Sequence, residues 1–162
     1  MDASTPALLA LAEAGVPHDV VRTERAHSAA ESAALQGIDV GALLRSIVVR
    51  RGENDYMFVL VPGGRRFDWP RLRAHLGVTR LSLPDAEEAR AVTGYPRGAI
   101  TPFGSTSPWP VIIDVSAMDQ PRVAIGGGAH GVNVHLRPAD LVTALRAAVA
   151  DVTVPDEAPA LD

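Results

Sequence analysis

Short apolar stretches alternate with polar turns along most of the chain, and their spacing predicts the secondary structure. Residues 43–51 and 56–61 are rich in Val, Ile, Phe and Tyr, and the polar residues 52–55 join them. This pattern predicts a β-hairpin, which we expect near the centre of a sheet. Shorter apolar runs predict further strands at residues 16–23, 111–115, 122–125 and 132–136.

Capping residues delimit the predicted helices. Thr5-Pro6 precedes an apolar run that stops at Gly15, and the capping-box pattern that begins at Ser28 is followed by an Ala-rich segment that stops at Gly37. Asp68 and Asp85 are suited to begin two more helices in the same way. We therefore expect helices at residues 6–14, 28–37, 69–75, 85–92 and 138–149.

The order of these elements predicts an α+β fold. Antiparallel hairpins are interspersed with helices, but strands and helices do not alternate regularly. A chain of 162 residues with 47% hydrophobic content can bury one sizeable core. We expect a single domain over residues 1–154, followed by a flexible, Pro- and acid-rich tail at residues 155–162.

The composition excludes several classes of site. The chain has no Cys, which excludes disulfides, thiolate metal ligands and Cys nucleophiles. All 15 basic residues are Arg, which excludes a Lys Schiff base and a Walker A motif. The five His show no ligand spacing, so we expect no metal site, and no cofactor. Because no apolar run or leader is long enough for a membrane segment, we expect a cytoplasmic protein without membrane contact.

Charge is unevenly distributed along the chain. The net charge of −4 argues against a protein that coats DNA. Residues 45–80 nevertheless contain eight Arg and three acidic residues, so this segment carries +5 and the remainder −9. The Arg-rich segment predicts either an ordinary solvated surface or a patch that faces phosphates, and charge alone favours the former.

Two glycine-rich segments, residues 94–104 and 126–131, are the most informative feature of the chain. Glycine can adopt positive φ and allows another backbone or a ligand to come close. An apolar strand pattern separates the two segments, so they are typical of the walls of a binding pocket.

The order of motifs resembles the YbaK/ProX family of aminoacyl-tRNA deacylases, which also occurs as an editing insertion in bacterial prolyl-tRNA synthetases. The resemblance covers residues 5 to 150. The matching pieces are Thr5-Pro6, His27 with the helix to Gly37, residues 44–49, residues 93–104, Ile112-Ile113-Asp114, and residues 127–131 leading to Asn133 and Leu136.

This resemblance implies a mixed, mostly antiparallel, barrel-like sheet flanked by helices, with a pocket for the 3′ CCA end of an aminoacyl-tRNA. It implies hydrolysis of mischarged tRNA in trans, of the Cys-tRNA(Pro) or Ala-tRNA(Pro) type, with an aminoacyl-tRNA synthetase as a possible partner. Family members are thought to need no protein nucleophile, so backbone N–H groups of the glycine loops would stabilise the oxyanion while a substrate group or water attacks. The implied catalytic positions are Arg45, Gly98, Gly127 and Gly128.

Some positions depart from the family pattern. Arg45 replaces the characteristic Lys; both are cations able to hold phosphate or ribose oxygens, but the planar fork and longer reach of Arg mean that the exchange is not automatically conservative. Ala99 replaces a Gly and is tolerable where φ is negative, whereas Thr101 retains the hydroxyl of the family's Ser. Asn133 replaces a frequent Asp and so removes a possible general base.

The remaining binding positions implied by the resemblance carry a structural alternative beside the functional one. His27 can border the pocket or shape a helix start, and His130 can approach a phosphate or be an exposed loop residue. Tyr95 can stack on adenine or fill the core, the latter being the more common use. The full set of expected substrate-binding residues is His27, Tyr95, Ala99, Ile100, Thr101, Pro102, His130, Gly131 and Asn133.

Two functions therefore remain open. One is an aminoacyl-tRNA deacylase with Arg45 as a cationic anchor. The other is a catalytically silent module that binds aminoacyl-tRNA, a nucleotide or a synthetase, which the exchanges at Arg45 and Ala99 keep possible. For the enzyme, we expect Val at Gly127 to abolish activity while the fold stays largely intact.

Overall fold

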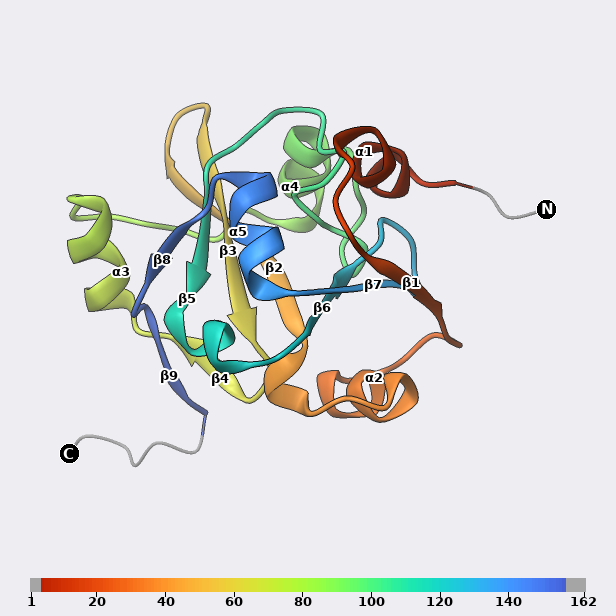
Figure 1. Cartoon of the computed structure of the whole chain (residues 1–162). Helices are drawn as coiled ribbons and strands as arrows, with labels where there is room; N and C mark the ends of the chain where they lie inside the picture. The colour runs from red at the N-terminus through yellow and green to blue at the C-terminus, as the bar shows by residue number, and fades with distance from the viewer. Residues whose placement is uncertain (1–3, 157–162) are drawn as a thin grey trace.

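The computed structural model describes residues 4–156 and is built on a four-stranded sheet (Figure 1). Strand β2 (Leu44–Gly52) pairs antiparallel with β3 (Asp55–Pro62), which pairs parallel with β5 (Val111–Asp114). Strand β8 (Ala148–Ala150) adds a parallel edge, giving the order β2-β3-β5-β8. The predicted hairpin is confirmed, and β3 lies inside the sheet as expected.

A second sheet continues the first across β2. It has the antiparallel order β1 (Asp19–Arg22), β7 (Val132–Leu136) and β6 (Val123–Gly126). A parallel bridge between Leu43 and Ala124 joins β6 to the start of β2. Strands β1 and β8 stay at opposite ends of this curved surface, so the expected barrel-like sheet does not close.

The helices follow the predicted caps. Side chains of Thr5, Ser28, Asp68 and Asp85 each accept a hydrogen bond from the backbone N–H three residues on, and a glycine in the left-handed region ends each of these four helices. The helices are α1 (Pro6–Ala14), α2 (Ala29–Gln36), α3 (Trp69–Leu76), α4 (Ala86–Thr93) and α5 (Pro138–Leu145), with 3-10 turns η1 (Val40–Ala42) and η2 (Val115–Asp119).

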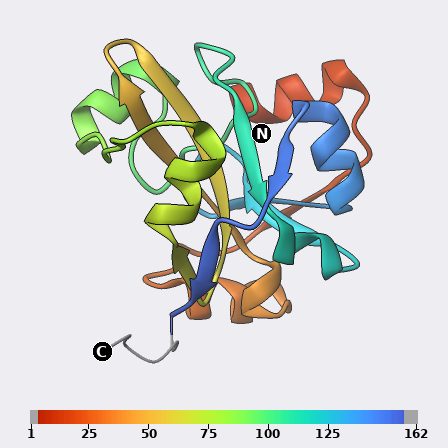
Figure 2. The same cartoon turned by 90° about the vertical axis from the view of Figure 1, so that its left-hand side faces the viewer.

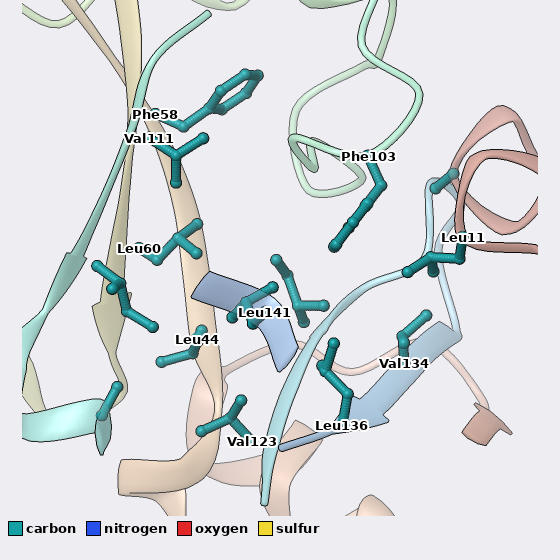
Figure 3. Packing of buried hydrophobic residues seen from close by; sticks show 14 of the residues in the cluster. Leu11, Leu44, Phe58, Leu60, Phe103, Val111, Val123, Val134, Leu136 and Leu141 are labelled. Atoms are coloured by element: carbon teal, nitrogen blue, oxygen red, sulfur yellow. The ribbon is translucent and has the colours of Figure 1, made fainter. Parts of the chain in front are cut away.

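Apolar side chains fill both faces of the four-stranded sheet. On one face Leu44 and Leu60 pack with Leu136 of the second sheet and Leu141 of α5, as Figure 3 shows. On the other face a smaller cluster contains Leu72 of α3, which lies in front of the sheet in Figure 2. Alternation along β2 and β3 sends successive side chains to these two cores.

The C-terminal part differs most from the sequence-based prediction. The helix predicted over residues 138–149 ends at Leu145, because Arg146 adopts the left-handed conformation and the chain then forms β8. Two further short strands were not predicted: β4 (Arg65–Phe67) pairs antiparallel with β9 (Thr153–Pro155). The predicted tail therefore begins inside β9, and the rest of it, residues 157–162, lies outside the described residues.

Candidate functional site

A cavity of about 650 Å³ opens beside β2, between the two sheets. Its walls come from β2, the N-terminal part of α4 and both glycine-rich segments. The lining includes Arg45, Ser46, Gly98, Ile100, Gly126 and Asn133. Of the predicted site residues, the structure thus brings Arg45, Gly98, Ile100 and Asn133 to one cavity.

An unpaired stretch of the β2 edge forms one wall of this cavity. Leu43 is bridged to β6, and Arg50 exchanges two backbone hydrogen bonds with Ser82, at 2.8 and 3.1 Å. Backbone groups of successive residues in a strand point to opposite edges, so Ser46 and Val48 present their N–H and C=O groups to the same edge as Arg50. Both residues line the cavity, which therefore has main-chain donors and acceptors along its wall.

The two glycine-rich segments touch each other, as predicted for the walls of a pocket. A Cβ on Gly98 would lie 2.8 Å from Cε1 of His130, and a Cβ on Gly126 would lie 3.6 Å from the carbonyl oxygen of Ile100. Gly98 has φ +89° in a turn that the N–H of Ala99 closes on Pro96. This closing bond leaves the N–H of Gly98 unused by the turn, at the cavity wall.

Gly127 and Gly128 have structural partners instead. The N–H of Gly127 donates to the carbonyl oxygen of Val132 at 2.8 Å, and its own carbonyl accepts from the Thr5 hydroxyl. A Cβ on Gly127 would lie 2.6 Å from Cγ1 of Val132, and one on Gly128 would lie 3.0 Å from Tyr95. The expectation that Val at Gly127 would leave the fold intact is therefore corrected. The added side chain would collide with Val132 in the hairpin formed by β6 and β7.

Arg45 lines the cavity, but its guanidinium is bound elsewhere. In register with Val61, its side chain leaves β2 on the face opposite Leu44 and Ser46. One terminal nitrogen donates to the carbonyl oxygens of Pro62, at 3.5 Å, and Arg65, while Nε is buried without a hydrogen bond. The cation therefore holds the end of β3 next to β4, and its approach to a substrate requires a change of side-chain conformation.

Ser46 is a lining residue that the sequence analysis did not single out. Its Oγ is buried and has no hydrogen-bond partner among residues 4–156. The available signal was the lone hydroxyl in β2, on the same face as the apolar residues Leu44 and Val48. An unpaired buried hydroxyl at a cavity wall is suited to bind a polar ligand atom.

Asn133 lies at the cavity with its side-chain amide directed to β1. Its Nδ2 donates to the carbonyl oxygen of Val21 at 3.2 Å, leaving the side-chain oxygen as an acceptor. Gly131 has φ +77°, and a Cβ there would lie 2.4 Å from the carbonyl oxygen of Thr23. The positive φ and the close approach explain why glycine occupies position 131.

The other predicted binding residues do not line the cavity. Tyr95 is buried, its hydroxyl donates to the carbonyl oxygen of Phe103 at 2.7 Å, and burial raises its pKa. Ala99 and Thr101 are also buried, and Pro102 is half-buried beside them. His27 is exposed ahead of Ser28, the N-cap of α2. The core-filling alternative for Tyr95 is the one that the structure favours.

Residues 4–156 contain no cluster of three His, Asp or Glu side chains suited to a metal ion. None of the described helices combines the length and the apolar character needed to span a bilayer.

Comparison with known proteins identifies the family. Residues 23–144 match the sequence profile of the aminoacyl-tRNA editing domain. The chain belongs to this family. The resemblance inferred from the motif order is confirmed, and the expectation of an aminoacyl-tRNA editing enzyme is supported at the level of the family.

Individual relatives of the editing domain are distant in sequence but close in structure. The chain is 23% identical over 128 residues to a protein of Enterococcus faecalis named for a proposed activity, Cys-tRNA(Pro)/Cys-tRNA(Cys) deacylase EbsC, and the match covers 78% of each chain. It is 26% identical over 121 residues to a proline–tRNA ligase of Thermosipho melanesiensis, where it covers 73% of this chain but 21% of the ligase. A crystal structure described as a proposed trans-editing enzyme for prolyl tRNA synthetase superposes with a TM-score of 0.85 at 29% identity, over 94% of this chain and 99% of the other.

Proposed function

We propose that the protein is a trans-acting aminoacyl-tRNA deacylase that hydrolyses the ester of mischarged tRNA in the cytoplasm. The observation that carries this proposal is the coincidence of the family match with the cavity. Every residue that lines the cavity lies within residues 23–144. The part of the chain that defines an editing domain thus also forms this cavity.

The main chain supplies groups suited to the chemistry of ester hydrolysis. Gly98, Ser46 and Val48 line the cavity and bring backbone N–H groups to its wall. Preorganised donors of this kind stabilise the negative charge of a tetrahedral intermediate. The oxygen of a water molecule attacks the ester carbon, the bond from this carbon to the ribose oxygen breaks, and the ribose oxygen takes up a proton. The products are the free amino acid and uncharged tRNA.

The proposed substrate is a tRNA(Pro) carrying a small wrong amino acid, Cys or Ala. The names of the Enterococcus relative and of the structural relative favour this substrate class. Apolar groups of Leu44, Val48, Ala89 and Ile100 line the cavity, which suits a short apolar or thiol side chain. Such a pocket separates side chains that differ by one methylene by only about 1–3 kcal/mol.

A synthetase is the proposed protein partner. The related domain forms part of the Thermosipho proline–tRNA ligases, of which this chain spans about a fifth. A separate chain that repairs the same error would act on tRNA released from such a ligase, or while bound to it.

A catalytically silent binding module is the second candidate, and one observation favours it. The Arg45 guanidinium is hydrogen-bonded to the carbonyls of Pro62 and Arg65 rather than free at the cavity. If this conformation persists in the complex, the cavity lacks the cationic anchor expected at Arg45.

Ester loss from a panel of charged tRNAs separates the two candidates. The protein is incubated with tRNA(Pro) charged with labelled Ala, Cys, Ser or Pro, and the remaining ester is followed with time. The deacylase releases Cys or Ala faster than the spontaneous rate and spares Pro. Binding of the charged tRNA with only the spontaneous rate of ester loss would establish the silent module instead.

A further inference from the structure

A second cavity, about 430 Å³ in volume, lies on the Arg-rich part of the molecule. Four arginines line it: Arg50 and Arg51 at the end of β2, Arg73 in α3, and Arg80 in the segment that follows α3. No acidic residue of the described chain lines it. We call this cavity, defined by these four arginines, the arginine cleft.

Two of the arginines are held in place and two are left for a ligand. Arg50 lies 3.5 Å from Glu88 and Arg51 lies 2.9 Å from Asp55, so each of these two charges has an acidic partner. Arg73 and Arg80 form no ion pair with any residue from 4 to 156. After both acids are counted the cleft retains two uncompensated positive charges. In a chain whose net charge is −4, this is a local reversal of sign.

The arginine cleft adjoins the candidate active-site cavity. Residues 79–82 line the cleft, and residues 83–86, the next along the chain, line the first cavity. Ser82, whose backbone pairs with Arg50, is the last residue of the first group and is followed directly by Leu83 of the second. A polyanion that reaches the cleft is thus directed toward the opening where the proposed ester is cleaved.

We propose that the arginine cleft binds phosphates of the tRNA acceptor stem while the 3′ end occupies the first cavity. This inference rests on the proposed function, because only an aminoacyl-tRNA substrate places a run of phosphates next to the reacting ester. Arginine guanidinium groups bind phosphate oxygens in bidentate fashion, and phosphate contacts position a nucleic acid without reading its sequence. The four arginines therefore act on substrate affinity rather than on the chemical step.

The test removes the two unpaired charges. Deacylated tRNA labelled with a fluorophore is titrated with wild type and with Arg73→Gln/Arg80→Gln at several salt concentrations. We expect the double variant to bind about tenfold more weakly and to reduce the salt slope by about 2, one for each lost phosphate contact. A control variant, Arg137→Gln/Arg146→Gln, removes the same charge from two exposed arginines that flank α5 and line neither cavity, and it should bind as wild type.

A second measurement distinguishes this inference from the proposed function. Cleavage of a small 3′-aminoacyl-adenosine ester, which cannot reach the cleft, should be equal in wild type and Arg73→Gln/Arg80→Gln, whereas the KM for aminoacyl-tRNA rises about tenfold in the variant. If the double variant binds tRNA with the affinity and salt slope of wild type, the proposal that the arginine cleft binds tRNA phosphates is overturned. If wild type cleaves neither ester, the proposed deacylase function is overturned. The tRNA titration would still decide whether the arginine cleft binds tRNA.

Discussion

The His130 imidazole lies directly over Gly98, so that a Cβ at position 98 would come within 2.8 Å of Cε1. This contact joins the two glycine-rich segments, which are 32 residues apart at this point. One segment contributes a turn with a backbone N–H at the cavity, and the other covers that turn from outside. The geometry of the proposed ester site thus depends on a residue without a side chain.

Gly98→Ala should lower both stability and ester cleavage. The backbone at φ +89° is strained for any residue with a Cβ, at a cost of about 1–2 kcal/mol, and the methyl group also pushes against His130. The double variant Gly98→Ala/His130→Ala removes the steric contact and should regain only part of the stability. Thermal unfolding and single-turnover cleavage measure the two effects. Equal stability of Gly98→Ala and wild type would contradict the strained turn.

Gly127→Val should destabilise the fold rather than only inactivate the protein. The new side chain collides with Cγ1 and the carbonyl oxygen of Val132 across the hairpin between β6 and β7, and we expect a loss of about 2–4 kcal/mol. Gly127→Ala should cost less. Denaturant unfolding gives the difference directly. A Gly127→Val protein with wild-type stability and no activity would instead place Gly127 at the substrate.

Arg45 has a structural role and a proposed role in cleavage, which substitution can separate. Arg45→Ala loses the hydrogen bonds to Pro62 and Arg65 and should cost about 1–3 kcal/mol of stability, together with most of the cleavage activity. Arg45→Lys keeps the charge without the planar fork, so it should lose stability but retain cleavage within severalfold. Unfolding midpoints and initial rates of ester loss give both values. Arg45→Ala with reduced stability and unchanged cleavage would show that the guanidinium serves only the fold.

Stability should fall in mild acid through His135. Burial, and then the charge of Arg122, lower the pKa of His135 below its ordinary value of 6.5. Asp19, paired opposite it on β1, acts in the other direction, and Nε2 lies 2.8 Å from the side-chain oxygen of Gln36. The unfolded chain thus binds a proton before the folded one, so stability present above pH 6.5 is lost as the pH falls toward the folded pKa.

The variant His135→Gln should flatten the dependence of the unfolding midpoint on pH between about 7 and 5. His18→Gln is the matched control, because it removes another imidazole, one residue before β1. If His135→Gln and wild type lose stability in parallel over this range, another group is responsible.

Local signals allowed most of the fold to be predicted. The helices from Thr5, Ser28, Asp68 and Asp85 begin and end where their caps and glycines indicate, because those hydrogen bonds form within a few residues. The missed strands depend on distant partners. The Ala- and Val-containing residues 148–150 suit a helix or a strand equally, and pairing with β5 decides between them.

The site was predictable in its backbone and not in its side-chain directions. The glycine-rich segments at Gly98 and Gly126 meet as expected, because glycine patterns reveal close approaches of the chain. The direction of Arg45 depends on its register with Val61, and the availability of Ser46 depends on a gap between two bridges of β2. Neither register nor gap is encoded in residues near these positions.

Ester loss from Cys-tRNA(Pro) in wild type and Ser46→Leu tests the central claim most directly. Ser46 lies in the cavity wall with its hydroxyl unpaired, so leucine projects into the cavity without removing a hydrogen bond from the fold. The account predicts rapid single-turnover cleavage by wild type, at least tenfold slower cleavage by Ser46→Leu, and folded protein in both cases. If a folded Ser46→Leu protein cleaves the ester at the wild-type rate, this would contradict the assignment of this cavity as the site where the ester is hydrolysed.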